Sequence, residues 1–357
     1  MDFGSRRQRI VAEFESLQID GFVTSRDIHV RYLTNLASSN AAVLVAPSGT
    51  FLFTDGRYAL MAQQRVTDCE IMVERHGVSA AIKQAAEVGL KRIGFESTHV
   101  SVAEMSALND VAAEAGIVLV AVTDVVEKLR LIKDDFEIDA ISQACHITDR
   151  AWEQVIADGV IGKSERELAG LVEMYFRKFG AEDRAFESIV ATGPNSAIPH
   201  HHPTDRIVER GDLLKMDCGA KVDGYHSDMT RTVVVGKAAD WQVEIYGEVN
   251  RAQQAAMNAC RPGADAFDMD AVARSLIEAA GYGKTLVHQI GHGVGLEIHE
   301  KPFLGRRDGI LQPRMPITVE PGIYLEGRGG VRIEDTILIV ADGHRRLTES
   351  TRDLLEV

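Results

Sequence analysis

The sequence predicts an α+β protein with two domains: an N-terminal α/β domain over residues 1–130 and a pseudo-symmetric α+β domain over residues 131–357. The 357 residues suffice for about two domains of ordinary size, each with its own core. Helix and strand patterns alternate through the first domain. From residue 134 onward, two helical patterns followed by strand patterns occur twice in succession, which predicts two similar halves.

The elements of the first domain follow from local patterns. Apolar residues at helical spacing predict a helix over residues 10–17 that ends at Gly21. Two strand-like runs around a Pro-Ser-Gly turn predict a β-hairpin over residues 41–54. Ser101 and Glu104 have capping-box spacing and therefore begin a helix. Further strands are predicted over residues 21–24, 70–74, 92–95 and 117–122.

The second domain has longer elements and contains most of the histidines. Seven of the twelve histidines fall between positions 200 and 299, which places the expected chemistry in this domain. The first domain shows no obvious catalytic set. Helices are predicted over residues 135–156, 164–179, 240–259 and 264–280. Strands are predicted over residues 188–192, 213–219, 225–235, 317–324 and 330–340.

Charge and composition exclude several function classes. The chain has 39 basic and 53 acidic residues, a net charge of −14 that disfavours nucleic-acid and anionic membrane partners. No apolar run approaches the roughly 20 residues that span a bilayer. Acidic residues rather than an apolar segment follow Arg6-Arg7, so we expect no export signal. Without a CxxC pair, the cysteines are expected to be reduced thiols of a cytoplasmic protein: Cys69, Cys145, Cys218 and Cys260.

Two aspartates lie on a predicted hairpin. Asp223-Gly224 is a strong two-residue turn signal, and that turn would place Asp217 opposite Thr230. Asp217 and Asp228 would then project from one face as diagonal neighbours. Two carboxylates so close repel each other unless a cation or a shared proton lies between them. If the strands paired in another register, one of the two aspartates would face solvent. From the hairpin alone, a metal site and a solvated aspartate are therefore equally compatible with the sequence.

A second carboxylate pair occurs on a second predicted hairpin. Glu320 and Glu334 each have apolar neighbours, and a Gly-rich connection joins their strands. Glutamate is seldom buried unless it is paired or bound to a metal. A second pair therefore favours a metal site over coincidence.

Two histidine-rich segments complete the candidate residues. His288, His292 and His299 lie within twelve residues of a strand-like run whose glycines allow close approach to a ligand, which favours a site. The triplet over residues 200–202 is by itself more typical of a solvated loop. Bridging carboxylates with one imidazole suit two divalent cations of the manganese type, with cobalt, iron or zinc as alternatives. The absence of thiolate ligands disfavours a structural zinc site.

The order of these residues resembles the pita-bread metallopeptidase family (M24). The similarity lies in the motifs DCG, SDMTRT, GHGVG, VEPGIY and VRIEDT, which contain the five candidate ligands Asp217, Asp228, His292, Glu320 and Glu334. Residues from about 135 onward resemble the pita-bread catalytic domain, and the first 130 resemble the N-terminal domain of aminopeptidase P, prolidase and creatinase. The resemblance is greatest to the short bacterial Xaa-Pro peptidases.

The resemblance implies roles for the candidate residues. Asp217 and Glu320 would each bind mainly one ion, His292 would complete one coordination sphere, and Asp228 and Glu334 would bridge two ions. Glu320 would also transfer a proton. His200 would be a catalytic histidine beside the site, and His299 would contact the substrate carbonyl and stabilise the tetrahedral intermediate. His288 would line the substrate cleft and Arg332 would support the ligands. A homodimer and short proline-containing peptide substrates are also implied.

The implied reaction is hydrolysis of the bond between an N-terminal residue and proline, as by aminopeptidase P. Prolidase, an Xaa-Pro dipeptidase with the same site, is the alternative, and a non-catalytic binding protein is disfavoured because all five ligands are present. A dipeptidase must recognise the carboxylate of its product proline. Phe303 stands where we would look for an arginine, which favours the aminopeptidase, although Lys301, Arg306 or Arg307 could substitute.

Overall fold

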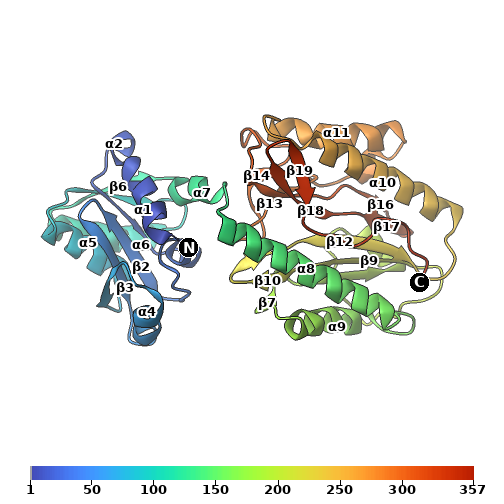
Figure 1. Cartoon of the computed structure of the whole chain (residues 1–357), viewed down its shortest axis with the longest axis horizontal. Coiled ribbons are helices and arrows are strands. Elements are labelled where there is room, and N and C mark those ends of the chain that lie inside the picture. The colour runs from blue at the N-terminus through green and yellow to red at the C-terminus, as the bar shows by residue number, and fades with distance from the viewer. Residues whose placement is uncertain (1) are drawn as a thin grey trace. The chain divides into compact units, whose positions relative to one another are not determined.

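The computed structural model describes residues 2–357, and the chain divides between Arg130 and Leu131 into two compact units (Figure 1). The first unit is an α/β domain around one mixed sheet, and the second combines several sheets with four long helices. Each unit contains buried apolar clusters of its own. The predicted fold class is therefore confirmed.

The sheet of the first unit has six strands in the order β4-β3-β2-β1-β5-β6. The central strand β1 pairs parallel with β5 and antiparallel with β2, and β2 and β3 form the predicted hairpin. The runs of apolar residues in β2 are buried throughout, as expected of a strand covered on both faces. The strands are β1 (Gly21–Thr24), β2 (Ala41–Ala46), β3 (Gly49–Thr54), β4 (Glu70–Val73), β5 (Arg92–Glu96) and β6 (Val118–Val122).

The helices of the first unit differ in part from the sequence prediction. The predicted N-terminal helix breaks at Glu13, and Gln18, with a φ of 54°, ends its second piece; Gly21 instead begins β1. The capping box of Ser101 and Glu104 begins its helix as predicted. The helices are α1 (Phe3–Ala12), α2 (Phe14–Leu17), α3 (Asp27–Thr34), α4 (Ala59–Arg65), α5 (Gly77–Glu87), α6 (Val102–Ala115) and α7 (Val125–Arg130).

The second unit begins with two helices that cover the strands of its first half. Capping boxes begin both helices, and their apolar residues share one buried cluster with strands β8, β9 and β12. The strands form the orders β11-β10-β7 and β12-β9-β8. The elements are α8 (Asp135–Ala157), α9 (Glu165–Lys178), β7 (Asp183–Arg184), β8 (Ile189–Thr192), η1 (Gly193–Ala197), β9 (Leu213–Cys218), β10 (Ala220–Val222), β11 (Tyr225–His226) and β12 (Met229–Val234).

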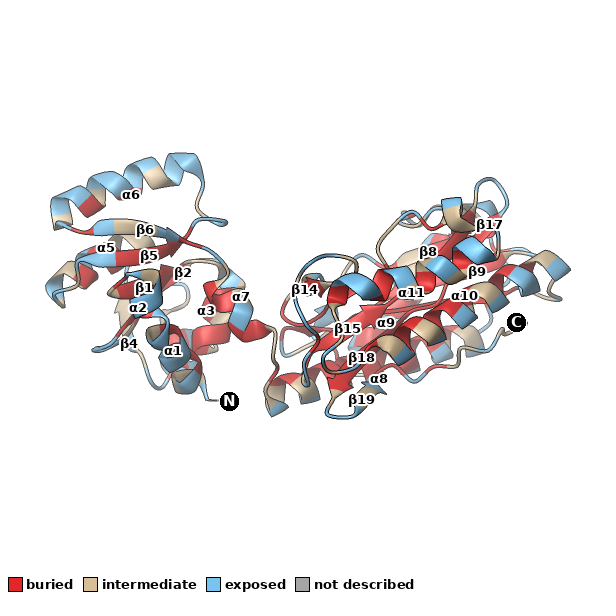
Figure 2. Ribbon diagram, turned by 90° about the horizontal axis from the view of Figure 1, so that it is seen from above, coloured by how far each residue is buried: buried red, intermediate tan, exposed pale blue. Residues whose placement is uncertain are grey.

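The second half repeats this arrangement, with two helices packed over strands. Helices α10 and α11 carry both buried and exposed residues, as expected of amphipathic helices that cover a core (Figure 2). The strands form the orders β14-β13-β15-β18-β19 and β16-β17. The elements are α10 (Asp240–Ala259), α11 (Ala266–Ala279), η2 (Gly283–Thr285), β13 (His292–Gly293), β14 (Glu300–Phe303), β15 (Pro316–Val319), β16 (Gly322–Leu325), β17 (Gly329–Arg332), β18 (Asp335–Val340) and β19 (Gly343–Arg346).

Both halves contain a long hairpin that is interrupted near its middle. In the first hairpin, Asp217 pairs with Thr230 and Val222 with Tyr225, so the register predicted from Asp223-Gly224 is confirmed. Strand pairing stops at residues 219 and 227–228 and resumes beyond them. In the second hairpin it stops at residues 320–321 and 333–334. The interruptions free these backbones from the sheets at the positions of Asp228, Glu320 and Glu334.

Only part of the histidine-rich run is a strand. His292–Gly293 forms β13, whereas most of residues 286–299 is irregular. The glycines let this run approach neighbouring main chain closely, because a Cβ atom at Gly291 would lie 2.1 Å from the carbonyl oxygen of Thr318. A Cβ at Gly293 would lie 2.3 Å from the carbonyl oxygen of Lys301. The run is thus pressed against neighbouring main chain, which places His292 close to the two interrupted hairpins. Among residues 2–357, no helix is long and apolar enough to cross a membrane.

Candidate metal centre

The five candidate ligands line one cavity of about 520 Å³ in the second unit. Their side chains come from both interrupted hairpins and from β13, so three segments far apart in sequence meet at this point. All six histidines singled out from the sequence line the same cavity. The polar lining comprises Asp217, Asp228, His292, Glu320, Glu334, His200, His288 and His299, together with Glu187, Ser188, His201, His202, Gln289 and Arg306.

Asp217 is fixed by a buried arginine. The guanidinium of Arg332 donates from Nη2 to Asp217 Oδ2, and both side chains are almost wholly buried. The other nitrogens of Arg332 donate to the hydroxyl of Tyr324 at 2.9 Å and to the hydroxyl of Thr230 at 3.0 Å. Arg332 thus orients a candidate ligand and does not line the cavity itself.

The same network donates one hydrogen bond to the carboxylate of Glu334. The hydroxyl of Thr230, which accepts from Arg332, donates to Glu334 Oε2 at 2.7 Å. The opposite oxygen, Oε1, is buried without a hydrogen-bond partner. Burial, and then repulsion by Glu320 and Asp217, raise the pKa of Glu334 well above its ordinary value.

Asp228, His292 and Glu334 form the tightest cluster. One ligand-type atom from each of the three side chains lies within 4.8 Å of those of the other two. His292 Nε2 is 3.6 Å from Asp228 Oδ2, while Nδ1 lies 3.0 Å from the carbonyl oxygen of Gly293. That contact suits a protonated Nδ1 and leaves Nε2 free to bind a cation. Burial, assisted by His299, lowers the pKa of His292 to about 3.

Glu320 connects this cluster with Arg332. Its Oε1 lies 3.5 Å from His292 Nε2, and its Oε2 lies 4.0 Å from Arg332 Nε. Burial is the largest influence on the pKa of Glu320, and with repulsion from Asp217 it outweighs Arg332 and raises that pKa to about 8. Burial, followed by the charges of Glu334 and Asp217, raises the pKa of Asp228 well above its ordinary value. Asp228, Glu320 and Glu334 therefore resist ionisation when no cation lies among them.

The donor set fits divalent cations. Four ionised carboxylates against the single guanidinium of Arg332 would leave three negative charges in a buried site. Asp217 Oδ1 and Glu334 Oε1 are buried without partners, although buried carboxylate oxygens normally accept hydrogen bonds. Two divalent cations would satisfy both oxygens and offset the charge, and carboxylate with imidazole is a donor set for ions such as manganese.

The remaining predicted histidines surround this cluster at different depths. The ring of His299 packs edge-on against that of His292, with centroids 4.4 Å apart. Partial burial, and then His200, lower the pKa of His299. His288 Nε2 lies 2.8 Å from the hydroxyl of Tyr324, and burial lowers the pKa of His288 to about 4. Both rings are therefore neutral near pH 7, so that each keeps one N–H donor and one acceptor nitrogen.

The His triplet divides into three environments. His200 is exposed and faces the cavity, and His202 is also exposed. His201 is buried, with Nε2 2.8 Å from Glu165 Oε2. The solvated-loop interpretation is therefore wrong for His201, which anchors the loop to α9.

Three supporting residues escaped the sequence analysis. The ammonium of the buried Lys215 donates to the carbonyl oxygens of Ser196 at 3.1 Å and Ile198 at 2.7 Å, on the loop that leads to His200. Thr230 links Arg332 to Glu334, and Glu165 accepts five hydrogen bonds from the same loop region. For Lys215 alone the sequence contained a clue: it precedes Asp217 by two residues on the same strand, so both side chains lie on one face.

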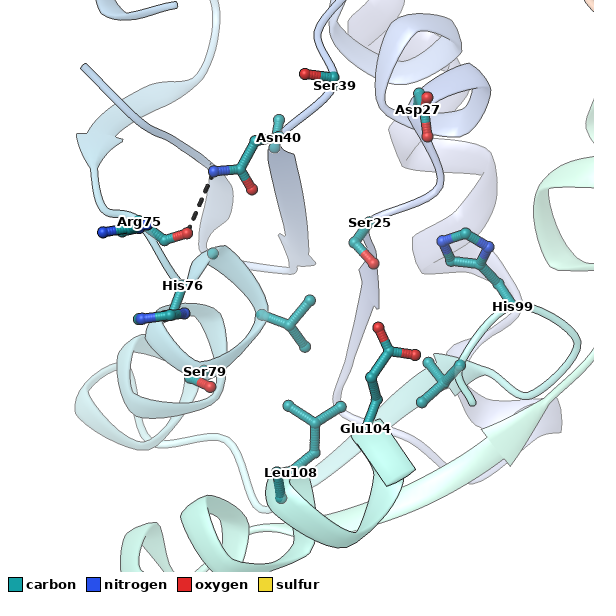
Figure 3. Close-up of a pocket in the computed structure, with 15 residues that line it drawn as sticks. Ser25, Asp27, Ser39, Asn40, Arg75, His76, Ser79, His99, Glu104 and Leu108 are labelled. Atoms are coloured by element: carbon teal, nitrogen blue, oxygen red, sulfur yellow. Dashed lines mark hydrogen bonds between the residues drawn. The ribbon is translucent and has the colours of Figure 1, made fainter. Parts of the chain in front are cut away.

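The first unit contains a cavity of about 470 Å³ and a separate carboxylate cluster. The cavity lies where β1 and β5 end and α5 begins, and Asn40 Nδ2 donates to the carbonyl oxygen of Arg75 at 3.2 Å across one side (Figure 3). The cluster of His29, Glu96 and Glu127 has metal-like spacing. However, Arg130 Nη1 lies 3.1 Å from His29 Nε2, so a guanidinium already occupies that position.

Comparisons with known proteins identify the class. Residues 139–341 match the model of metallopeptidase family M24, and residues 6–132 match the creatinase/prolidase N-terminal domain. The chain therefore belongs to metallopeptidase family M24 and is an enzyme of that class. The predicted resemblance is confirmed.

Individual relatives match nearly the whole chain. An Xaa-Pro dipeptidase from Pyrococcus horikoshii is 37% identical over 359 residues, which is 99% of this chain and 100% of that protein. The solved Xaa-Pro dipeptidase from Bacillus anthracis is 36% identical with a TM-score of 0.94, covering 99% of this chain and 100% of that one. The solved X-Pro aminopeptidase from Thermotoga maritima MSB8 is 34% identical with a TM-score of 0.89, covering 96% of this chain and 99% of that one.

Proposed function

We propose that the protein is an Xaa-Pro dipeptidase that depends on two divalent cations. The observation that carries the proposal is the convergence of Asp217, Asp228, His292, Glu320 and Glu334 on one cavity, with two carboxylate oxygens left without partners. Two of the three relatives described above are named Xaa-Pro dipeptidase. That support favours the dipeptidase over the aminopeptidase P-like activity to which the sequence alone gave preference.

In this proposal each ligand has a distinct place. Asp228 and Glu334 would hold both ions, since their carboxyls lie with His292 in the tightest part of the cluster. Asp217, oriented by Arg332, and Glu320 would each hold one ion. His292 would hold one of the ions through Nε2. Manganese is the favoured metal, with cobalt, iron and zinc as alternatives.

The reaction would use this chain's own groups for proton transfer and positioning. When bound, the two cations supply an activated water near neutral pH and polarise the scissile carbonyl. Glu320 accepts the proton of the attacking water and returns it to the proline nitrogen as the bond breaks. The leaving nitrogen must gain a proton as the bond breaks, as in any amide hydrolysis, and the nitrogen of the Xaa-Pro bond carries no hydrogen beforehand.

The histidines would position the substrate and stabilise charge. His299 lies against His292 at the mouth of the cavity, so its N–H can donate to the oxygen that becomes negative in the transition state. His200 faces the same cavity, and His288 lines it while held by Tyr324. We further propose that the enzyme is a cytoplasmic homodimer acting on short proline-containing peptides. Its four cysteines, all free, are compatible with a reducing compartment.

The test compares Ala-Pro, Ala-Pro-Ala and Ala-Ala as substrates in manganese buffer, before and after treatment with a chelator. We expect hydrolysis of Ala-Pro alone, its loss on chelation and its recovery when Mn²⁺ is returned. Bound metal is measured on the same sample. Cleavage of the tripeptide without the dipeptide would show an aminopeptidase instead. Two bound ions without turnover of any proline peptide would contradict the proposal.

A further inference from the structure

The cavity contains one permanent cation that the proposed reaction does not use. Among its described lining residues, Arg306 is the sole arginine or lysine. Arg332 is buried behind Asp217 and does not line the cavity, and Arg307 packs over the ring of Phe267 outside it. Among the described lining residues, Arg306 is therefore the one permanently charged cationic side chain that can pair with a negatively charged group of a substrate.

The backbone places Arg306 next to the ligand strand. Phe303, at the end of β14, pairs with His292 across the sheet. The N–H of Arg306 donates to the carbonyl oxygen of Phe303 at 3.1 Å and closes a tight turn, in which Gly305 has a φ of +91°. The guanidinium then lies 4.7 Å from the centroid of the Phe303 ring. The turn thus holds the cation on an aromatic face beside His292.

The guanidinium is available to a ligand. Within residues 2–357 no carboxylate forms an ion pair with Arg306. The nearest acidic side chain in sequence, Asp308, accepts the N–H of Phe303 at 2.8 Å and so is committed to the turn. Arg306 is exposed at the rim, where its five donors can form a paired contact with a carboxylate.

We infer that Arg306 binds the free carboxylate of the substrate's proline and so selects dipeptides over longer peptides. The inference rests on the proposed dipeptidase function and adds the residue that sets its length preference. An Xaa-Pro dipeptide carries its carboxylate on the residue after the scissile bond. The carboxylates that line the cavity would repel this substrate carboxylate unless positive charges offset them, and Arg306 supplies one such charge. A longer peptide has an uncharged amide at the same position, so its binding would gain nothing from the charge of Arg306.

The experiment compares Arg306→Met with Arg307→Met on two substrates, Ala-Pro and its uncharged C-terminal amide, in the manganese-loaded full-length enzyme. We expect Arg306→Met to raise KM for Ala-Pro about tenfold or more, as for loss of a charged hydrogen bond, with kcat changed little. Hydrolysis of Ala-Pro amide should not change. Arg306→Lys should recover part of the affinity for Ala-Pro, because lysine keeps the positive charge but cannot donate two parallel hydrogen bonds to a carboxylate as a guanidinium does. Arg307→Met should behave as wild type on both substrates.

Three results would separate the inference from the proposed function. If wild type fails to hydrolyse Ala-Pro, the dipeptidase proposal itself is wrong. If wild type cleaves Ala-Pro and Arg306→Met retains the wild-type KM, the inference alone is wrong. Equal losses on Ala-Pro and its amide would also overturn the inference, because they would show a role unrelated to the carboxylate.

Discussion

Glu320 and Glu334 lie opposite each other at the interruption of the second hairpin. Val319 pairs with Asp335 on one side and Gly322 with Arg332 on the other, and this register continues across the gap. The backbone N–H groups of both glutamates leave the hairpin: that of Glu320 donates to the carbonyl oxygen of Ile290 at 2.7 Å. The N–H of Glu334 donates to the carbonyl oxygen of Thr230 at 3.1 Å, which joins the second hairpin to the first.

The first prediction concerns the bridging role of Glu334. Glu334→Gln should lower kcat/KM for Ala-Pro by at least about 10³-fold, because several kcal/mol of transition-state stabilisation depend on the two bound cations. The melting temperature of the metal-free variant should not fall, since an amide removes a buried carboxylate that Glu320 and Asp217 repel. Glu326→Gln, on the exposed turn of the same hairpin, is the control and should keep full activity. Activity assays and elemental analysis of bound metal check this, and full turnover by Glu334→Gln would contradict the ligand assignment.

The second prediction concerns Arg332 as a support for the ligands. Arg332→Met should weaken metal binding by about 10- to 100-fold. Asp217 would lose the guanidinium that orients its carboxylate, and the hydroxyl of Thr230 would lose the hydrogen bond that it accepts from Arg332. Competition with a chelating dye measures the apparent metal affinity. At saturating metal part of the activity should return, whereas Asp217→Asn should not recover in this way. Unchanged metal affinity in Arg332→Met would show that the network does not tune the site.

Much of this site could be predicted from the sequence because local geometry fixes it. A two-residue Asp-Gly turn sets the register, and alternation along a strand then places Asp217 and Asp228 on one face. The supporting residues could not be predicted in this way. Lys215 reaches carbonyls 17 and 19 residues away, and His201 reaches Glu165 across 36 residues. Such contacts depend on how distant loops pack, which leaves no periodic pattern in the chain.

The third prediction concerns the pH dependence of the metal-free enzyme. A carboxyl whose pKa is raised on folding stabilises the fold below its unfolded pKa, and that contribution is lost as pH rises through the folded value. For Glu320 the window runs from about 4.3 to about 8. The pKa values of His292 and His288 are lowered to about 3 and 4, so these two groups make the fold more stable as the pH rises toward about 6.5 and add no further change above it. The melting temperature of the metal-free protein should therefore fall between pH 6.5 and 8.

Bound cations should reverse this trend, because they favour the ionised carboxylates and compete with protons. The difference in melting temperature between metal-loaded and metal-free protein should grow by about 4 °C or more from pH 6.5 to 8. Calorimetry at both pH values, with and without Mn²⁺, measures it. A difference that stays constant or shrinks with pH would show that ionisation of Asp228, Glu320 and Glu334 is not coupled to metal binding as proposed.

The fourth prediction concerns the close packing at Gly219, where the first hairpin is interrupted. A Cβ atom there would lie 1.9 Å from the carbonyl oxygen of Ser227 and 3.0 Å from the Cβ of Ala185, so main chain would have to move. Gly219→Ala should therefore lower the free energy of unfolding by about 3 kcal/mol or more and displace Asp228, which follows Ser227. Gly170→Ala is the matched control, since that glycine lies within α9 with nothing within 4 Å of the added methyl group. It should raise stability by about 0.5–1 kcal/mol and leave metal binding unchanged. Denaturant unfolding and metal titration of both variants measure these effects, and equal stability in the two would mean that the hairpin tolerates the displacement.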